Sequence, residues 1–163
     1  MSRKRSFPPV VDENVRLLLL GSLPGERSLE ARQYYAHPQN RFWELAGAVI
    51  EEDLRAMAYE KRLATLLAHG IGLWDVIAEA ERPGSLDAAI RNETHNALAD
   101  LAATLPRLRA VGFNGGTAAK IGRRRLAGLD TRLRLIDLPS SSPAYTLAFE
   151  IKRAAWLPLA ENI

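Results

Sequence analysis

The sequence contains no cysteine. This absence excludes a disulfide framework and thiolate catalysis, and it removes the commonest structural zinc sites, which use cysteine ligands. Long apolar runs are also lacking, because the four leucines at residues 17–20 are far too short to cross a bilayer. Residues 1–9 carry charges without the apolar core of a signal peptide. We therefore expect a soluble, cytoplasmic protein with no membrane partner.

The chain is long enough for one ordinary domain. Its 163 residues can bury a continuous core without disulfides or a metal ion. We expect a single domain over residues 1–163, in which residues 1–12 form a flexible basic arm. The formal net charge is +3, a modest excess that suits DNA but that many other proteins share. Charge alone gives only slight support to a nucleic-acid partner.

Apolar runs and helical patterns alternate along the chain. Short apolar runs typical of buried strands occupy residues 15–20, 71–77, 108–113 and 133–138. Apolar residues repeat at helical spacing in residues 39–50, 59–68, 94–105, 116–126 and 146–157. Strands that alternate with helices favour a mostly parallel sheet covered by helices on both faces. The pattern predicts the α/β class.

The loop Gly-Ser-Leu-Pro-Gly at residues 21–25 follows the first strand at its carboxyl end, where open α/β sheets place their ligands. The loop lacks the Lys-Ser/Thr ending of a P-loop and the third glycine of a dinucleotide fingerprint. It is a poor nucleotide-cofactor motif, and we expect neither a cofactor nor a metal ion. A ligand loop and a purely structural turn are equally good interpretations of these five residues alone.

Aromatic and amide side chains gather just after this loop. Tyr34 and Tyr35 precede His-Pro-Gln, and Asn40 follows. A flipped nucleobase needs an aromatic ring to stack on, worth about 1–3 kcal/mol per base, and hydrogen bonds along its edge. Neighbouring tyrosines in an extended chain point in opposite directions, so we expect at most one to stack and the other to pack in the core. For Asn40, capping of the helix that follows is the alternative.

With these residues the chain resembles the uracil-DNA glycosylase superfamily. The spacing from Pro24 and Gly25 to Ala-His-Pro-Gln-Asn-Arg-Phe-Trp at residues 36–43 matches the mismatch-specific uracil/thymine branch without a gap. The set GSLPG, QYYAHPQN, GLWDV, FNGG and SSSPA, over roughly residues 17–144, resembles the hypoxanthine-DNA (deoxyinosine) glycosylases. The resemblance implies a three-layer α/β/α sandwich with a central, mostly parallel four-stranded sheet. It also implies a DNA repair enzyme that hydrolyses the N-glycosidic bond of a flipped, deaminated base and leaves an abasic site.

The resemblance assigns roles to the first segment. Tyr35 falls where the mismatch-specific branch has the aromatic residue that stacks on the extruded base. Leu23 falls where that branch has its water-positioning asparagine, and a leucine cannot orient water. The deoxyinosine glycosylases use the asparagine that corresponds to Asn40 as their main catalytic side chain. We therefore expect Asn40 to be catalytic, with Tyr35, Ser22 and Leu23 at the base.

Two further strand ends offer polar side chains to the same sheet edge. Asp75 ends the second strand, whose counterpart in the superfamily often reads the base edge. An ionised Asp75 would accept from the N1–H group that hypoxanthine has and adenine lacks, whereas the alternative is a hydrogen bond to loop amides. Asn114 is a second candidate base contact, and a structural turn is the favoured role of Gly115 and Gly116, which follow it.

The loop after the last strand is a candidate DNA contact. Ser140, Ser141, Ser142 and Pro143 offer hydroxyls and backbone amides that suit a phosphodiester, although three serines can equally form an ordinary loop. The loop matches the second motif of the superfamily in place but lacks the histidine and the leucine wedge often found there. Whether Tyr145 or no residue acts as a wedge is open at this point.

Other functions compete with deoxyinosine excision. A pocket that accepts hypoxanthine can also accept xanthine or a uracil imide, so a general or mismatch-specific uracil-DNA glycosylase is one alternative. Because Leu23 cannot position water, a catalytically weak lesion-DNA-binding protein is another, and a small-nucleotide-binding protein is a third. These loops contain no lysine for a Schiff base. We therefore expect a monofunctional, monomeric enzyme whose partner is DNA containing deaminated bases.

Overall fold

The computed structural model describes residues 3–163 and has a four-stranded sheet at its centre. The sheet order is β3-β2-β6-β7, and all neighbouring strands run parallel. The strands are β2 (Leu17–Gly21), β3 (Ile71–Asp75), β6 (Ala110–Asn114) and β7 (Arg134–Leu138). The apolar runs of the sequence thus form a four-stranded parallel sheet, as predicted.

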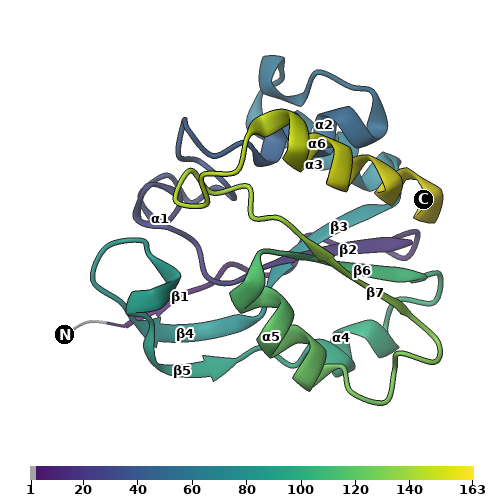
Figure 1. Ribbon diagram of the computed structural model, residues 1–163. Helices are drawn as coiled ribbons and strands as arrows, with labels where there is room; N and C mark the ends of the chain where they lie inside the picture. The colour runs from purple at the N-terminus through teal and green to yellow at the C-terminus, as the bar shows by residue number, and fades with distance from the viewer. Residues whose placement is uncertain (1–2) are drawn as a thin grey trace.

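Helices cover both faces of this sheet (Figure 1). Leu17 and Leu19 of β2 join one apolar core and Leu18 and Leu20 join the other, because successive side chains of a strand point to opposite faces. The first core includes residues of α2 (Phe42–Ile50), α3 (Tyr59–Ala68) and α6 (Phe149–Trp156). The second core includes residues of α4 (Leu98–Ala103) and α5 (Gly116–Arg125). The three-layer α/β/α sandwich is confirmed.

A second, smaller sheet was not predicted. It is antiparallel, has the order β1-β4-β5, and consists of β1 (Lys4–Arg5), β4 (Ile77–Glu81) and β5 (Arg91–His95). The apolar run at residues 71–77 divides at Val76, whose N–H donates to Gly21 O at 2.8 Å. The chain then leaves the parallel sheet and enters the antiparallel one. The helix predicted from residue 94 begins at Leu98, because Thr94 and His95 pair with β4.

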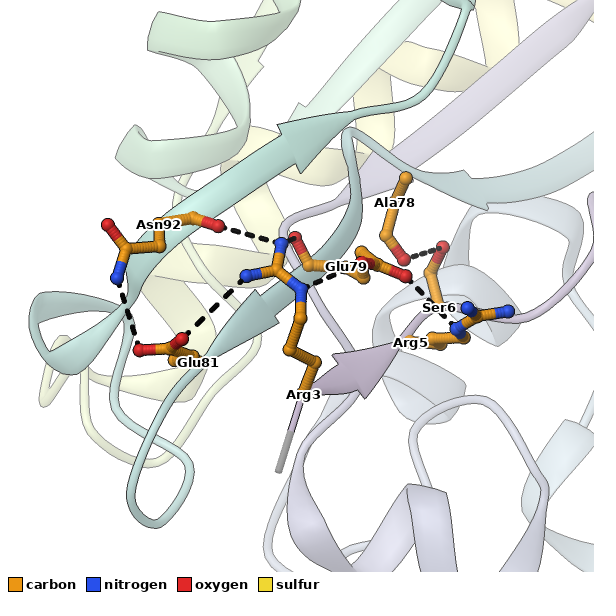
Figure 2. A network of polar contacts seen from close by, with 7 residues as sticks. All are labelled: Arg3, Arg5, Ser6, Ala78, Glu79, Glu81 and Asn92. Carbon is orange, nitrogen blue, oxygen red and sulfur yellow. Dashed lines mark hydrogen bonds and ion pairs between the residues drawn. The ribbon is translucent and has the colours of Figure 1, made fainter. Parts of the chain in front are cut away.

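Residues 3–8 of the predicted basic arm make specific contacts with the rest of the fold. Figure 2 shows Arg3 and Arg5 on opposite sides of Glu79, with N–O distances of 2.7 and 3.0 Å. Farther along, Phe7 O accepts from Trp74 Nε1 at 2.9 Å, and Pro8 O accepts from the Tyr34 hydroxyl at 3.1 Å. The basic charges of this segment thus pair with acidic residues of the fold. Residues 1 and 2 lie outside the described residues.

The remaining elements are short. They are α1 (Glu26–Ala31), which was not predicted, and the 3-10 helices η1 (Leu54–Ala56), η2 (Asp87–Ala89) and η3 (Leu157–Asn162). Over residues 3–163, none of the helices is both long and apolar enough to span a membrane.

Candidate active site

A cavity of about 240 Å³ opens at the carboxyl edge of the parallel sheet. Its walls come from the ends of β2, β3 and β6, from the loops after β2 and β7, and from the loop that joins β4 to β5. Figure 1 shows these loops on the same side of the molecule, around α1. Every residue predicted for the site lines this cavity: Ser22, Leu23, Tyr35, Asn40, Asp75, Asn114, Ser140, Ser141, Ser142 and Pro143.

Tyr35 forms an aromatic part of the wall. Its ring stacks on Phe42 with 3.9 Å between centroids and an interplanar angle of 9°. The residue has a left-handed backbone with φ of 54°, an uncommon conformation for a tyrosine, and its carbonyl accepts from Trp43 Nε1 at 3.2 Å. Tyr34, by contrast, is buried in the core. Phe42 and Trp43 therefore hold the Tyr35 ring in place from behind.

Asn40 lies at the start of α2. Its Oδ1 accepts from the N–H of Phe42, the first residue of α2, at 3.0 Å, whereas the N-cap residue of the helix is Arg41. The same half-buried residue also lines the cavity. The contact with Phe42 fixes which amide atom is the oxygen, and that oxygen keeps a second lone pair. A contact with the start of α2 and a contact with a substrate water are therefore compatible.

Asp75 is the most unusual polar group of the site. Only 3% of the residue is exposed, and Oδ2 finds no hydrogen-bond donor anywhere in residues 3–163. The pKa of its carboxyl group is raised from 3.8 to about 7, chiefly by burial. The negative charge of Asp87 contributes to this rise, and the positive charge of Arg82 opposes it. Leaving a buried oxygen unpaired costs free energy, so a ligand that brings a donor would relieve this cost.

Gly21 creates the space between this carboxyl group and the tyrosine. A Cβ atom at this position would lie 2.7 Å from Asp75 Oδ1 and 2.8 Å from the Tyr35 hydroxyl. Real Cβ atoms essentially never approach other atoms so closely. The absence of a side chain at residue 21 therefore keeps the floor of the cavity open.

Asn114 and Ser141 are engaged with each other, which differs from their predicted direct contacts with base and DNA. Asn114 Nδ2 donates to Ser141 Oγ at 2.9 Å, and Ser141 N–H donates to Asn114 Oδ1 at the same distance. Asn114 Nδ2 also lies 3.4 Å from the Tyr35 hydroxyl. Ser141 is 1% exposed, so its hydroxyl is not at the surface. This pair fastens the loop after β7 to the end of β6.

The remaining predicted site residues, which lie in the loops after β2 and β7, differ in exposure. Ser140 and Ser142 are half-buried, and Pro143 is exposed. Leu23 is buried in the apolar core beside the sheet, in accordance with its inability to orient a water molecule. Ser22 Oγ donates to Asp87 Oδ1 at 2.7 Å.

Sequence reasoning missed one wall of the cavity, which consists of Ser85, Leu86 and Asp87 in the loop between β4 and β5. The pair Pro83-Gly84 is a turn signal that could have located a loop in the sequence, but no local pattern shows that this loop lies beside the cavity. It also missed Lys152 of α6, whose Nζ donates to Ser142 O at 3.1 Å. Among the described residues, no lysine lines the cavity.

The fold and the site thus define an α/β protein with a parallel sheet and a cavity at the carboxyl edge of that sheet. An aromatic ring, an amide and a buried carboxyl group line this cavity. Residues 8–160 match the Uracil DNA glycosylase superfamily, and the chain belongs to this superfamily.

Similar proteins cover nearly the whole chain. The Hypoxanthine DNA glycosylase of Methanosarcina barkeri is 40% identical over 155 residues, which span 94% of this chain and 96% of the relative. The protein of the same name from Methanosarcina acetivorans is 43% identical over 154 residues, with coverages of 94% and 95%. A solution NMR structure of a candidate Uracil DNA glycosylase from Methanosarcina acetivorans has a TM-score of 0.87 and 41% identity. That comparison covers 98% of this chain and 97% of the solved one.

Proposed function

We propose that this protein is a monofunctional DNA-deoxyinosine glycosylase, which flips hypoxanthine out of DNA and hydrolyses its N-glycosidic bond. The observation that carries the proposal is the buried, unpaired Oδ2 of Asp75 in a cavity that also presents Tyr35 and Asn40. The two relatives named Hypoxanthine DNA glycosylase support the choice of base.

Asp75 and Tyr35 would hold the extruded base. The N1–H group of hypoxanthine supplies the donor that Asp75 Oδ2 lacks, whereas N1 of adenine carries no hydrogen and cannot supply it. One face of the Tyr35 ring is covered by Phe42, and the other face is the one we assign to base stacking. Asn114 would act by positioning Tyr35 and Ser141, because its amide is already bonded to both.

Asn40 would hold the attacking water. The second lone pair of its Oδ1 can accept an O–H bond of water and so orient the water oxygen. That oxygen forms a bond to C1′ while the C1′–N9 bond breaks, and the bonding pair leaves with hypoxanthine. The water gives up one proton to solvent and the hypoxanthine anion takes one up from solvent, so the products are an abasic sugar and neutral hypoxanthine. The sugar passes through an oxocarbenium-like transition state, so catalysis depends on holding water and base in line. The absence of a lysine from the described cavity lining supports hydrolysis without a Schiff base.

Excision of uracil is the second candidate. The N3–H group of uracil is a ring donor like the N1–H group of hypoxanthine, so the unpaired Asp75 oxygen suits both bases. A contact with Asp75 alone therefore does not distinguish excision of hypoxanthine from excision of uracil.

The test uses end-labelled duplexes that carry one deoxyinosine, one uracil or no lesion, with alkali to cleave abasic sites. We expect release from the deoxyinosine duplex and none from the undamaged one. Asn40→Ala should slow release at least about a hundredfold, because a positioned acid, base or water contact contributes on this order. The neighbouring Gln39→Ala is the control, since Gln39 is exposed and does not line the cavity. Tight lesion binding without release would favour the binding-protein alternative, and faster release of uracil would favour the second candidate.

A further inference from the structure

An exposed leucine stands at the mouth of the cavity. Leu86 is 60% exposed and lines the cavity from the loop between β4 and β5. The other large apolar side chains exposed in the described chain, Tyr145 at 49% and Ile151 at 56%, are not among the cavity-lining residues. Single exposed leucines are common on proteins, so exposure alone assigns no role. The position beside the opening for the base is what distinguishes Leu86.

The loop that carries Leu86 is firmly held against the other wall of the cavity. The buried guanidinium of Arg82 donates to Pro24 O at 2.5 Å and to Gly84 O at 3.0 Å. Ser85 Oγ accepts from Glu26 N–H at 2.9 Å. These contacts join the residues around Leu86 to the loop after β2.

Two more polar contacts flank the leucine. Asp87 accepts from Ser22 Oγ at 2.7 Å, and Lys4 Nζ donates to Gly84 O at 2.7 Å. Hydrogen bonds therefore restrain the loop on both sides of Leu86, yet the leucine itself stays in water. Because the loop is already ordered, less conformational entropy is lost when the leucine side chain inserts into a binding partner.

Flipping a base leaves a gap in the stack of bases that remain. Apolar side chains such as leucine can enter a base step, and filling the gap offsets part of the cost of unstacking and unpairing. We propose that Leu86 is the wedge that occupies this gap, so that the wedge comes from the loop between β4 and β5. This inference rests on the proposed function, because a gap exists only when a base is extruded.

Tyr145, the wedge candidate considered from the sequence, is less suited to this role. It lies on the loop after β7, where its ring centroid is 5.4 Å from Lys152 Nζ. It does not line the cavity, whereas Leu86 does. Of these two apolar side chains, Leu86 is therefore the one that borders the cavity.

The test compares duplex and single-stranded DNA, because only the duplex needs a wedge. We would measure single-turnover release of hypoxanthine from deoxyinosine in both forms for the wild type, Leu86→Ala, Leu86→Met and Ile151→Ala. Leu86→Ala should lose about tenfold or more on the duplex and change less than about twofold on the single strand. Leu86→Met should keep most of the duplex rate because methionine is also apolar and long. Ile151→Ala is the matched control for removing an exposed aliphatic side chain.

A second measurement reports extrusion without chemistry. With 2-aminopurine beside the lesion, the wild type should raise fluorescence on binding, and Leu86→Ala should not. Equal losses on duplex and single strand, or an unchanged duplex rate, would overturn the wedge assignment. If the wild type releases no base from either form, the proposed function fails, and the fluorescence comparison still decides whether Leu86 unstacks the duplex.

Discussion

At the scale of single residues, Asp75 decides how the site depends on pH. Its carboxyl group is buried beside Gly21, and burial raises its pKa to about 7. Below this pH the group is mainly protonated, and above it the group is an anion that only accepts hydrogen bonds. The acceptor role that we propose for Oδ2 toward a base N–H is strongest in the ionised form.

This reasoning predicts a pH profile. Release of hypoxanthine by the wild type should rise as the pH increases through about 7, because Asp75 loses its proton in that range. Asp75→Asn carries no titrating group and should lose this rise. It should also be slower above pH 8, by roughly tenfold to a hundredfold, the amount expected when a charged hydrogen bond is lost.

Single-turnover rates between pH 5.5 and 8.5 provide the measurement. Glu26→Gln is the control, because Glu26 also lines the cavity but is exposed. A profile of Asp75→Asn that keeps the same rise would show that another group titrates, and a rate that falls as Asp75 ionises would contradict the acceptor role.

At the scale of elements, α5 packs closely onto β6 at Gly122. A Cβ atom at this glycine would lie 2.2 Å from Cε1 of Phe113, which is fully buried. The missing side chain therefore sets how near the helix lies to the strand that ends in Asn114.

Gly122→Ala should destabilise the fold by about 1–3 kcal/mol, because the cost of overpacking exceeds the gain in helix propensity. Urea denaturation would measure this loss of unfolding free energy as a lower midpoint concentration with an unchanged m-value. Gly116→Ala lies in the same helix, where an added Cβ meets no atom within 4 Å, and should be neutral or slightly stabilising. A Gly122→Ala protein as stable as the wild type would refute this account of the packing.

The elements differ in how far the sequence could predict them. The parallel strand β2 is apolar and fully buried, whereas β7 also contains the exposed Arg134 and Asp137. The helix α3 was predicted at residues 59–68, where it lies. β5 could not be found this way, because its sequence, RNETH, is polar and mostly exposed and has no apolar alternation. It exists because β4 pairs with it, which is a tertiary effect.

The candidate site likewise combines residues that the sequence could predict with contacts that it could not. Residues at strand ends were predictable because parallel strands bring their carboxyl ends to one edge, whereas Tyr35 and Asn40 were assigned from the resemblance to a known family. The pairing of Asn114 with Ser141 joins residues 27 positions apart, and the place of Leu86 depends on Arg82 reaching the loop after β2. Neither contact leaves a local pattern, so only the folded chain reveals them.

At the scale of the whole molecule, the cavity lies where the two sheets meet. β3 continues into β4 through Val76, so Asp75 of the parallel sheet and Asp87 after the antiparallel strand β4 face the same space. β1 completes the smaller sheet, and Arg3 and Arg5 pair with Glu79 there. The basic N-terminal segment thus helps to hold one wall of the site in place.

The most direct measurement is to identify the products formed from a deoxyinosine duplex without alkali, by mass spectrometry. The account predicts free hypoxanthine in equal amount to abasic sites, on strands that are otherwise intact. Strand cleavage without a free base, or no product at all, would contradict the central claim that this cavity hydrolyses the N-glycosidic bond of deoxyinosine.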